Sequence, residues 1–589
     1  MMTIGFSISM RIVQIINQFN GGGRLANKMQ LFYVLKIPTS YIIANNSNIN
    51  ISFDEARKKG FIVSLGDNQL LRFIRKINDR ENPKKEVEEL YRKRNRIISY
   101  EDSEAGREEI GEIQRKIDEL TFVSDIIIIK TDTTRADYKY LCKNGLKITI
   151  TVGKKKYVCE YTRLCAGAGQ LRRNSAVFVD KTELDKLETI MMCGLTKNKI
   201  GKINLAKFNA YFSLYTSAMK QVTKPRICVI DDFEYTLKDQ KIAWIFENEE
   251  GENDIEVRNM EFEQNGFDGS GIISPQMAKK WAIDMELDYT PASFIIRSAW
   301  IKGLVSIFDF KKFAKEVAHT DKIKDLWGEE YDVEDIDVIL TKSQFKLWKK
   351  YANWQEYLYY HAKFDHIFGV ARVSKKSNDF YTPLNYQYIQ SNNFTEESIK
   401  CLADFTIEWI KEVLKGDKLS TMLFLLGEHD DGDEIDKIEN ECNNYIAKCL
   451  IYTDEILNDS YVRNKIGNMM EKKIRQTKIG KLYVEGSYDF AIPDLYALCE
   501  HAFGMEVKGL LPAKYSWNKR WVEKGSSVVS MQRSPLVAPS ENQLRYISFD
   551  ERCKEWYKYI YSGMIMSLWD TGMARCSDAD YDGKMYCCL

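Results

Sequence analysis

Two strand-like stretches separated by a long helical one constrain the fold of this chain more than any other feature. From about Phe122 onward, short apolar or alternating runs such as LKITITVG and KKYVCEY are separated by Gly and Asn, which indicates strands. Between about Phe313 and Gly480, apolar residues recur at three- and four-residue spacing, which indicates helices. The last hundred residues return to short strand-like runs such as KLYVEG. The pattern predicts an α+β chain in which a long helical connector joins two sheet regions.

The amino-terminal part is predicted to be helical and charged. At 589 residues the chain is long enough for several domains with more than one core. Residues 82–120 are rich in charged, helix-favouring residues, and the pattern predicts a helical hairpin broken near Ser99 to Ala105. Such a pair is most often a solvated scaffold.

The charge balance limits how the chain could bind nucleic acid. Its 85 Lys and Arg equal its 85 Asp and Glu, so bulk positive charge cannot hold a phosphate backbone and a local basic channel is needed. Basic stretches with aromatic residues near Lys472 and Lys508 could line such a channel, and a plain solvated face is the equal alternative.

No targeting or membrane segment is apparent. The most apolar long stretch, residues 293–308, carries Arg297 and Lys302 inside it, so a membrane span is not expected. The first residues lack the pattern of a secretory signal, which makes the cytoplasm the expected compartment. The thirteen Cys include no CxxC pair and are expected to be reduced thiols.

The sharpest chemical feature is SDADYDGK near the carboxyl end. Asp578, Asp580 and Asp582 alternate with other residues before Gly583, and a strand or a tight Gly loop can gather such carboxylates onto one point. An oxygen-rich site of this kind suits Mg²⁺, and two such ions can assist an in-line phosphoryl transfer. The alternatives are a solvated acidic turn and a Ca²⁺-binding module, although the loop lacks the bidentate Glu of an EF-hand.

Several blocks give the sequence a resemblance to the cellular, eukaryotic-type RNA-dependent RNA polymerases. DADYDGK resembles the DbDGD loop, with b bulky, that this family carries in the second of two double-psi β-barrels. The resemblance implies that Asp580 and Asp582 bind Mg²⁺. Lys584 stands in place of the third aspartate, and Asp578 is the candidate third metal ligand.

Two further blocks supply the other candidate site residues. QRSPLVAP, residues 532–539, resembles a block that lies beside the incoming nucleotide, which implies that Arg533 contacts nucleotide and ribose. FIIRSAWIKG, which is similar to the end of the family's first barrel, keeps both basic residues, Arg297 and Lys302. The resemblance implies that Lys302 projects toward the active centre, where its ammonium group can meet phosphate. FDGSGIIS, residues 267–274, and looser blocks at 162–179, 206–218 and 382–390 follow the family's order.

The resemblance covers roughly residues 122–589 and implies an architecture of two double-psi barrels. The chain stops five residues after Lys584, whereas a barrel normally continues past its catalytic loop, so the second barrel is expected to be incomplete. The expected regions are a helical amino-terminal region with the charged hairpin, a mixed strand and helix region, the core of the first barrel, the helical connector and the second barrel with the aspartate loop, at 1–121, 122–255, 256–312, 313–480 and 481–589.

The function implied is that of an RNA-dependent RNA polymerase. It would extend an RNA 3′ end with ribonucleoside triphosphates on a single-stranded template, with Mg²⁺ as cofactor. Two alternatives remain open. One is a DNA-dependent single-chain RNA polymerase of phage or mobile-element type. The other is an inactive or split polymerase fragment that binds nucleic acid and is completed by a second chain.

Overall fold

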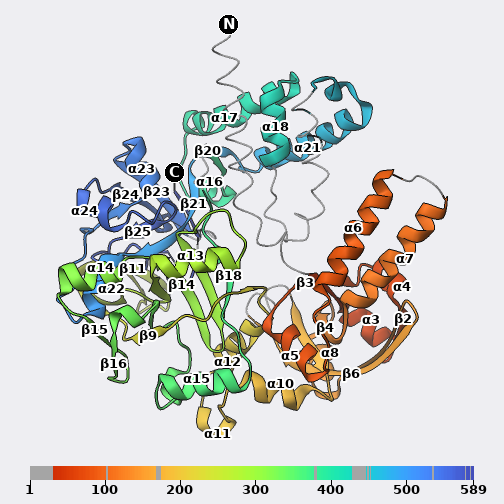
Figure 1. Ribbon diagram of the computed structural model, residues 1–589. Helices are drawn as coiled ribbons and strands as arrows, with labels where there is room; N and C mark the ends of the chain where they lie inside the picture. Colours follow the sequence, from red (N-terminus) through yellow and green to blue (C-terminus); the bar gives the residue numbers. More distant parts are fainter. Residues whose placement is uncertain are drawn as a thin grey trace.

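A computed structural model describes most of the chain (Figure 1). It shows a mixed α+β protein in which an amino-terminal sheet unit lies beside two further sheets that pack together. In the described part of the chain, no helix is both long and apolar enough to cross a bilayer. The described residues are 31–100, 104–167, 174–376, 381–427, 446, 450, 453–533, 536, 538–576, 579–583 and 585–588.

The amino-terminal unit is built on a seven-stranded sheet with the order β2-β5-β6-β7-β4-β1-β3. The Ile-rich strand β4 has four strands on one side and two on the other, and nearly all its side chains are buried, as expected of an interior strand. β5 alternates buried and exposed positions, because only one of its faces meets the core. The strands are β1 Leu31–Pro38, β2 Asn48–Ser52, β3 Ile62–Gly66, β4 Phe122–Lys130, β5 Leu146–Val152, β6 Lys155–Cys165 and β7 Ser175–Asp180.

Helices flank this sheet, and two of them form the charged hairpin. α6 and α7 pack through Val87, Ile113 and Ile117 and extend away from the sheet (Figure 1). The expectation that residues 1–121 are helical needs correction, since β1, β2 and β3 lie within them. Strands of five to eight residues beside charged helices give too short an alternation to stand out. The helices are α3 Thr39–Ala44, α4 Phe53–Lys58, α5 Gln69–Ile77, α6 Lys84–Tyr100, α7 Glu104–Thr121, α8 Arg135–Asn144, α10 Leu184–Met191, α11 Lys197–Ile200 and α12 Leu205–Phe212.

The middle of the chain forms a second seven-stranded sheet, with the order β8-β18-β13-β14-β12-β17-β9. It reaches well beyond residues 256–312, where we expected the core of the first barrel. β17 and β18 lie inside 313–480, which we expected to be a helical connector, and this is a further correction. Each has only four or five residues between helical segments, so neither gives a recognisable strand pattern. The strands are β8 Lys220–Gln221, β9 Ile227–Ile230, β12 Ser270–Ile273, β13 Ser293–Ser298, β14 Ile301–Ile307, β17 Val338–Thr341 and β18 Gly369–Val373.

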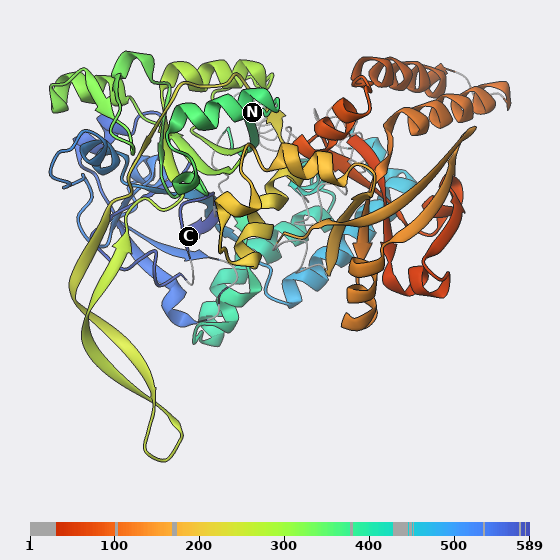
Figure 2. The same ribbon diagram turned by 90° about the horizontal axis from the view of Figure 1, so that it is seen from below.

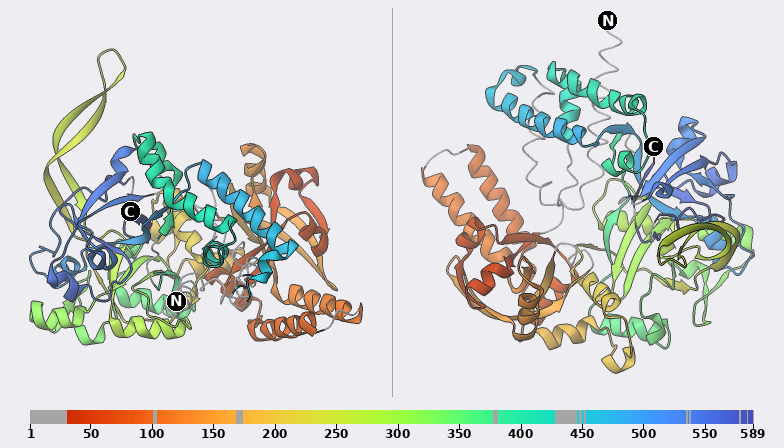
Figure 3. Two further views of the ribbon diagram at one scale, coloured as in Figure 1. Left: turned by 90° about the horizontal axis from the view of Figure 1, so that it is seen from above. Right: turned by 180° about the vertical axis from the view of Figure 1, so that it is seen from behind.

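Between β9 and β12 the chain makes a long two-stranded hairpin, β10 Glu234–Glu247 and β11 Asn253–Asn265, which stands away from the body (Figures 2 and 3). The segments around and after the second sheet also include the short pairs β15 with β16 and β19 with β20. Helices α17, α18 and α21 pack together on residues such as Trp409, Phe424 and Met470. These elements are α13 Pro275–Asp284, α14 Phe310–Phe313, β15 Lys322–Lys324, β16 Glu330–Asp332, α15 Trp354–Lys363, β19 Tyr381–Pro383, α16 Tyr386–Gln390, α17 Glu396–Leu414, α18 Lys418–Gly427, α21 Ser460–Lys478 and β20 Tyr483–Glu485.

The carboxyl-terminal part forms a closed six-stranded barrel with the order β21-β25-β22-β24-β23-β26. β26 pairs with β21 on one side and with β23 on the other, so the expectation of an incomplete second barrel is wrong. Four residues suffice to satisfy the backbone groups of both neighbouring edges. The elements are β21 Ser487–Pro493, α22 Leu495–Ala502, β22 Tyr515–Trp517, α23 Lys519–Lys524, β23 Val528–Arg533, β24 Asn542–Ile547, α24 Glu551–Trp556, β25 Met564–Met566 and β26 Met585–Cys588.

The second sheet and the barrel share one apolar core. It joins Leu304 of β14 to Ile492 and Ile565 of the barrel. Phe308, which follows β14, stacks on Trp556 of α24 with ring centroids 5.6 Å apart. Burial of these aromatic side chains fixes the two sheets relative to each other and so places the loops at their boundary.

Candidate active site

Lys302 enters the site from the second sheet, at the start of β14. The turn before it contains Trp300, which is fully buried and has a left-handed φ of 57°. Its indole packs against Phe208, Phe212 and Tyr215, with ring centroids 6.2 to 6.4 Å apart. This aromatic anchor holds a backbone conformation that a bulky residue rarely adopts, and it thereby fixes where Lys302 begins.

The aspartate loop enters the site from the barrel, between β25 and β26. The Nζ of Lys302 donates to Oδ2 of Asp582 at 2.6 Å, an ion pair between residues 280 positions apart. The backbone N–H of Asp582 donates to Oδ1 of Asp580, with N and O 3.2 Å apart. The backbone N–H of Tyr581 donates to the carbonyl of Asp268 at 2.8 Å. The loop is therefore tied both to itself and to the second sheet.

The ion pair is partly accessible to solvent. The side chain of Lys302 is 30% exposed and that of Asp582 is 19% exposed, so a substrate could reach both groups. Asp578 and Lys584 lie outside the residues that the structure describes.

Arg297 lies directly across the β13–β14 hairpin from Lys302. Its Nη1 donates to the carbonyl of Ile296 at 2.8 Å, and its buried Nε has no hydrogen-bond partner within the part of the chain that the structure describes. Burial lowers the pKa of its guanidinium, and the charge of Asp582 acts in the opposite direction. The structure therefore places a second cationic side chain beside Lys302 and within the field of Asp582.

Arg533 is the last residue of β23 and contacts the segment that precedes the aspartate loop. Its Nη1 donates to the carbonyl of Cys576 at 2.7 Å, four residues before Asp580. Its backbone lies opposite Tyr586 of β26. The structure therefore joins Arg533 to the chain that leads into the aspartate loop.

Sequence reasoning missed three residues that face the same charges, namely Asp268, Lys346 and Tyr211. Burial lowers the pKa of Lys346, and the neighbouring charge of Lys302 lowers it further, while the nearby aspartates oppose both effects. The backbone N–H of Lys346 donates to the carbonyl of Trp300 at 2.8 Å, which places Lys346 beside the turn before Lys302. Burial raises the pKa of Tyr211, and Asp268 adds to this effect whereas Lys302 opposes it. Asp268 belongs to the DGSG block and Tyr211 to the looser block at 206–218, so both could have been found there, but Lys346 carries no sequence signal.

The donor set of the aspartate loop fits a divalent cation in kind. Carboxylate oxygens such as those of Asp580 and Asp582 are the ligands that Mg²⁺ prefers. Over the described residues, no group of three or more His, Cys, Asp and Glu side chains is arranged to hold a metal ion. The cation that meets Asp582 in this structure is the ammonium group of Lys302.

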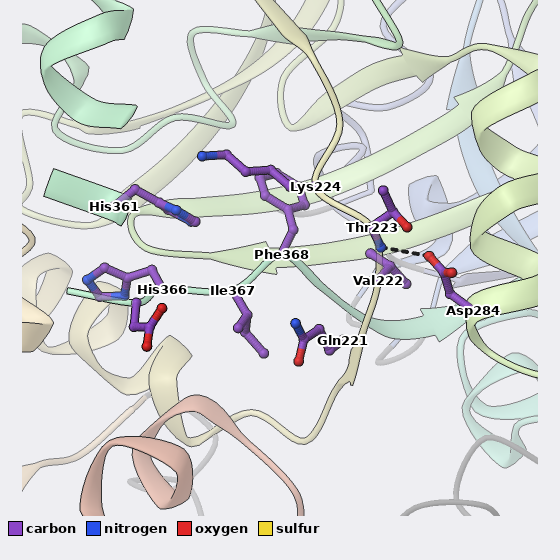
Figure 4. Close-up of a pocket in the computed structure, with 10 residues that line it drawn as sticks. Gln221, Val222, Thr223, Lys224, Asp284, His361, His366, Ile367 and Phe368 are labelled. Atoms are coloured by element: carbon purple, nitrogen blue, oxygen red, sulfur yellow. Dashed lines mark hydrogen bonds between the residues drawn. The ribbon is translucent and has the colours of Figure 1, made fainter. Parts of the chain in front are cut away.

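A cavity of about 520 Å³ lies elsewhere, beside the segment that links β8 to β9 (Figure 4). His361 and His366 line it together with Lys224 and Asp284. Burial lowers the pKa values of His361 and His366 to about 2 and about 3, so both rings are neutral at physiological pH. None of its lining residues belongs to the aspartate loop or to the other candidate residues from the sequence.

Comparison with known proteins settles the family. The family model for RNA-dependent RNA polymerases matches residues 103–587, and the chain belongs to this family, which confirms the resemblance seen in its motifs. The chain is 29% identical over 436 residues to the DNA-directed RNA polymerase YonO of Bacillus phage SPbeta, a match that covers 72% of this chain and 48% of that protein. The chain thus spans about half the length of this curated relative. A solved structure, the RNA-dependent RNA polymerase QDE-1 from Thielavia terrestris, is similar with a TM-score of 0.43 and 12% identity, over 79% of this chain and 49% of that one.

Proposed function

We propose that this chain is an RNA polymerase that extends an RNA 3′ end with ribonucleoside triphosphates on a single-stranded template. The observation that carries the proposal is the ion pair between Lys302 and Asp582, which brings a cation from one sheet onto the acidic loop of another. In this proposal the second sheet and the closed barrel are the two double-psi barrels of the family, and the active centre lies where their loops meet.

Asp580 and Asp582, with Asp578 as a third ligand, would hold Mg²⁺. When bound, the metal would lower the pKa of the attacking 3′-hydroxyl and neutralise charge on the attacking and leaving oxygens. The hydrogen bond from the Asp582 N–H to Asp580 orients the carboxylate of Asp580. The bond from Tyr581 to Asp268 holds the whole loop against the second sheet.

The basic residues would bind the triphosphate and the primer end. Lys302, already 2.6 Å from Asp582, offers a compact positive charge to phosphate oxygens at the same place. Arg297, which lies opposite Lys302 on the β13–β14 hairpin, would add a second positive charge at the same place. Arg533 would contact the nucleotide and ribose. Its hydrogen bond to the carbonyl of Cys576 fixes its position relative to the aspartate loop.

The template is proposed to be RNA, with DNA as the second candidate. The family match supports RNA, whereas the phage relative is described as DNA-directed, which favours DNA. Exposed basic residues of α21, including Lys472, Arg475 and Lys478, could contact the strand, but Lys473 is buried with its Nζ 3.6 Å from the ring centroid of Tyr483. A polymerase that is completed by a second chain is the alternative to this proposal.

The test is incorporation of labelled ribonucleotides by the purified chain, with Mg²⁺, on single-stranded RNA and on single-stranded DNA. The double variant Asp580→Asn/Asp582→Asn should abolish template-dependent product. The double variant Asp239→Asn/Asp254→Asn removes the same charge from exposed positions of the β10–β11 hairpin and should leave product unchanged.

The template that gives product decides between RNA and DNA. If the folded chain gives no product on either template but still binds single strands, catalysis by this chain alone is refuted. The alternative hypothesis, an inactive or split polymerase subunit that binds nucleic acid, then replaces the proposal.

A further inference from the structure

The β10–β11 hairpin is long and projects into solvent (Figures 2 and 3). Its base is fixed by Tyr235, which stacks on Phe233 at 4.9 Å between ring centroids and donates a hydrogen bond to the carbonyl of Leu568. Beyond this base the ribbon has two strands only, and an isolated two-stranded ribbon is marginally stable in water. The side chains on its two faces therefore decide what it contacts.

One face of the hairpin is covered by its own residues. The guanidinium of Arg258 lies over the rings of Trp244 and Phe246, at 5.4 and 5.8 Å from their centroids. Arg258 also forms an ion pair with Glu256. The aromatic and charged side chains of this face therefore already contact one another through cation–π and ionic interactions.

The opposite face is an uncovered aliphatic stripe. The register pairs Ala243 with Val257 and Ile245 with Ile255, so these four side chains lie on one face in two adjacent rows. Ile245 and Ile255 are each 64% exposed and Val257 is 70% exposed. We call this set of four residues the hairpin stripe. Large aliphatic side chains gathered and exposed to this extent mark a contact surface.

The charges around the stripe indicate the kind of partner. Residues 234–265 contain ten acidic and three basic residues, which would repel the phosphate backbone of nucleic acid. On the face of the stripe, Lys241 lies two residues toward the base and Glu247 two residues toward the tip. From base to tip, this face of β10 thus carries a basic residue, two aliphatic residues and an acidic residue. Such an order is complementary to itself when it is reversed.

We propose that the hairpin stripe is a self-association surface on which a second copy of this chain packs its own stripe about a two-fold axis. A two-fold axis through the stripe reverses base and tip, so the aliphatic rows of the two copies meet. Lys241 of each copy then lies opposite Glu247 of the other. A parallel arrangement would bring the two acidic tips together and is disfavoured.

The size of the stripe sets the strength of this association. Four aliphatic side chains are fewer than the 20 or so residues, about 800 Å² for each partner, of a standard stable interface. The dimer is therefore weak and forms in a concentration-dependent way. The two Lys241–Glu247 pairs are peripheral to the stripe, so they select the antiparallel arrangement more than they add affinity.

Sedimentation velocity on the full chain, from about 1 to about 200 µM, tests the proposal. The wild-type chain should shift from monomer to dimer across this range. Lys241→Glu and Glu247→Lys each place like charges opposite one another twice, and each should weaken association by about tenfold or more. The double variant Lys241→Glu/Glu247→Lys restores opposite charges and should return association to the wild-type level.

Asp254→Lys is the matched control, because it makes the same charge change as Glu247→Lys on the opposite face of the hairpin. It should leave association unchanged, and circular dichroism should show that all variants are folded. A chain that stays monomeric over the whole range overturns the proposal. So does a dimer that ignores the single exchanges, or one that the double exchange does not restore.

Discussion

Gly269 and Asp582 approach each other so closely that no side chain fits between them. A Cβ at position 269 would lie 2.8 Å from the Cβ of Asp582 and 3.1 Å from its backbone nitrogen. Gly269 also has a φ of +79°, in the left-handed region that favours glycine. Glycine at this position thus lets the DGSG loop of the second sheet lie directly against the aspartate loop of the barrel.

Gly269→Ala is therefore expected to displace the aspartate loop. A shift of about 1 Å at a reacting group can cost about 100-fold in rate, and we expect a loss of ribonucleotide incorporation of that order. The control is Gly60→Ala, where φ is +69° but nothing lies within 4 Å of the added Cβ. Equal incorporation by the two variants would contradict the proposed importance of this contact.

Lys302→Met should have opposite effects on metal binding and on catalysis. Removal of the ammonium group takes away the cation that pairs with Oδ2 of Asp582, so Mg²⁺ should raise the thermal denaturation midpoint of the variant more than that of the wild type. Incorporation should fall by about 100-fold or more, because a charge that meets the phosphates is lost. Both quantities can be measured on the same preparation.

Lys312→Met is the matched control for this prediction. Lys312 pairs with Glu555 at the same 2.6 Å and also joins α14, which follows β14 of the second sheet, to α24 of the barrel region. If its loss changes the response to Mg²⁺ as much as Lys302→Met does, the effect belongs to ion pairs in general and not to the aspartate loop.

Trp300→Ala should destabilise the protein and reduce activity together. The fully buried indole packs on an aromatic cluster, and its removal leaves a cavity that costs about 3–5 kcal/mol. Since the turn that it anchors leads into Lys302, incorporation should fall even at temperatures where the variant is folded. Thermal denaturation and incorporation at low temperature measure the two effects separately. Trp244→Ala, which removes a half-exposed indole from the hairpin, should change neither by much.

Glu183 makes the stability of the amino-terminal unit depend on pH. Burial and the neighbouring Asp125 raise the pKa of Glu183 from 4.5 to about 7, while Asn78 donates a hydrogen bond to its Oε1 and opposes the shift. The folded state therefore holds a proton that the unfolded state releases, and its stability falls as pH rises from 4.5 to about 7.

Glu183→Gln should remove this dependence, because the amide has nearly the same shape as the protonated carboxyl and stays neutral across this pH range. The variant should be more stable than the wild type above pH 7, by about 2 kcal/mol, and equal to it near pH 4.5. Thermal denaturation across this pH range checks the prediction. Glu188→Gln on α10 should leave the pH profile as in the wild type, and a wild-type curve that rises with pH over the same interval would refute the assignment.

The sequence was informative where short motifs carry chemistry. DADYDGK and FIIRSAWIKG each comprise a few adjacent residues, and through their resemblance to the family's blocks they nominate Asp582 and Lys302, which the structure places 2.6 Å apart. The family was also predictable, because many loose blocks in the right order add up to a specific pattern. The class of fold, α+β, followed from the alternation of strand-like and helical stretches.

The remainder depends on tertiary contacts that local patterns do not encode. β17 and β18 are four- and five-residue strands whose conformation is stabilised by pairing with β12 and β13. β26 is a strand only because β21 and β23 offer it two open edges. Lys346 is a lysine in an unremarkable segment, and only its hydrogen bond to the turn at Trp300 brings it near the aspartates.

During synthesis, β26 is the last strand of the barrel to leave the ribosome, and domains fold in the order in which they emerge. A nascent chain can already contain the folded amino-terminal unit and the second sheet, with Lys302 in place, while the barrel still has an open edge. The segment that carries Asp580 and Asp582 is anchored at its far end only when residues 585–588 pair with both neighbours. The aspartate loop therefore reaches its final position in the barrel only after residues 585–588 have been translated.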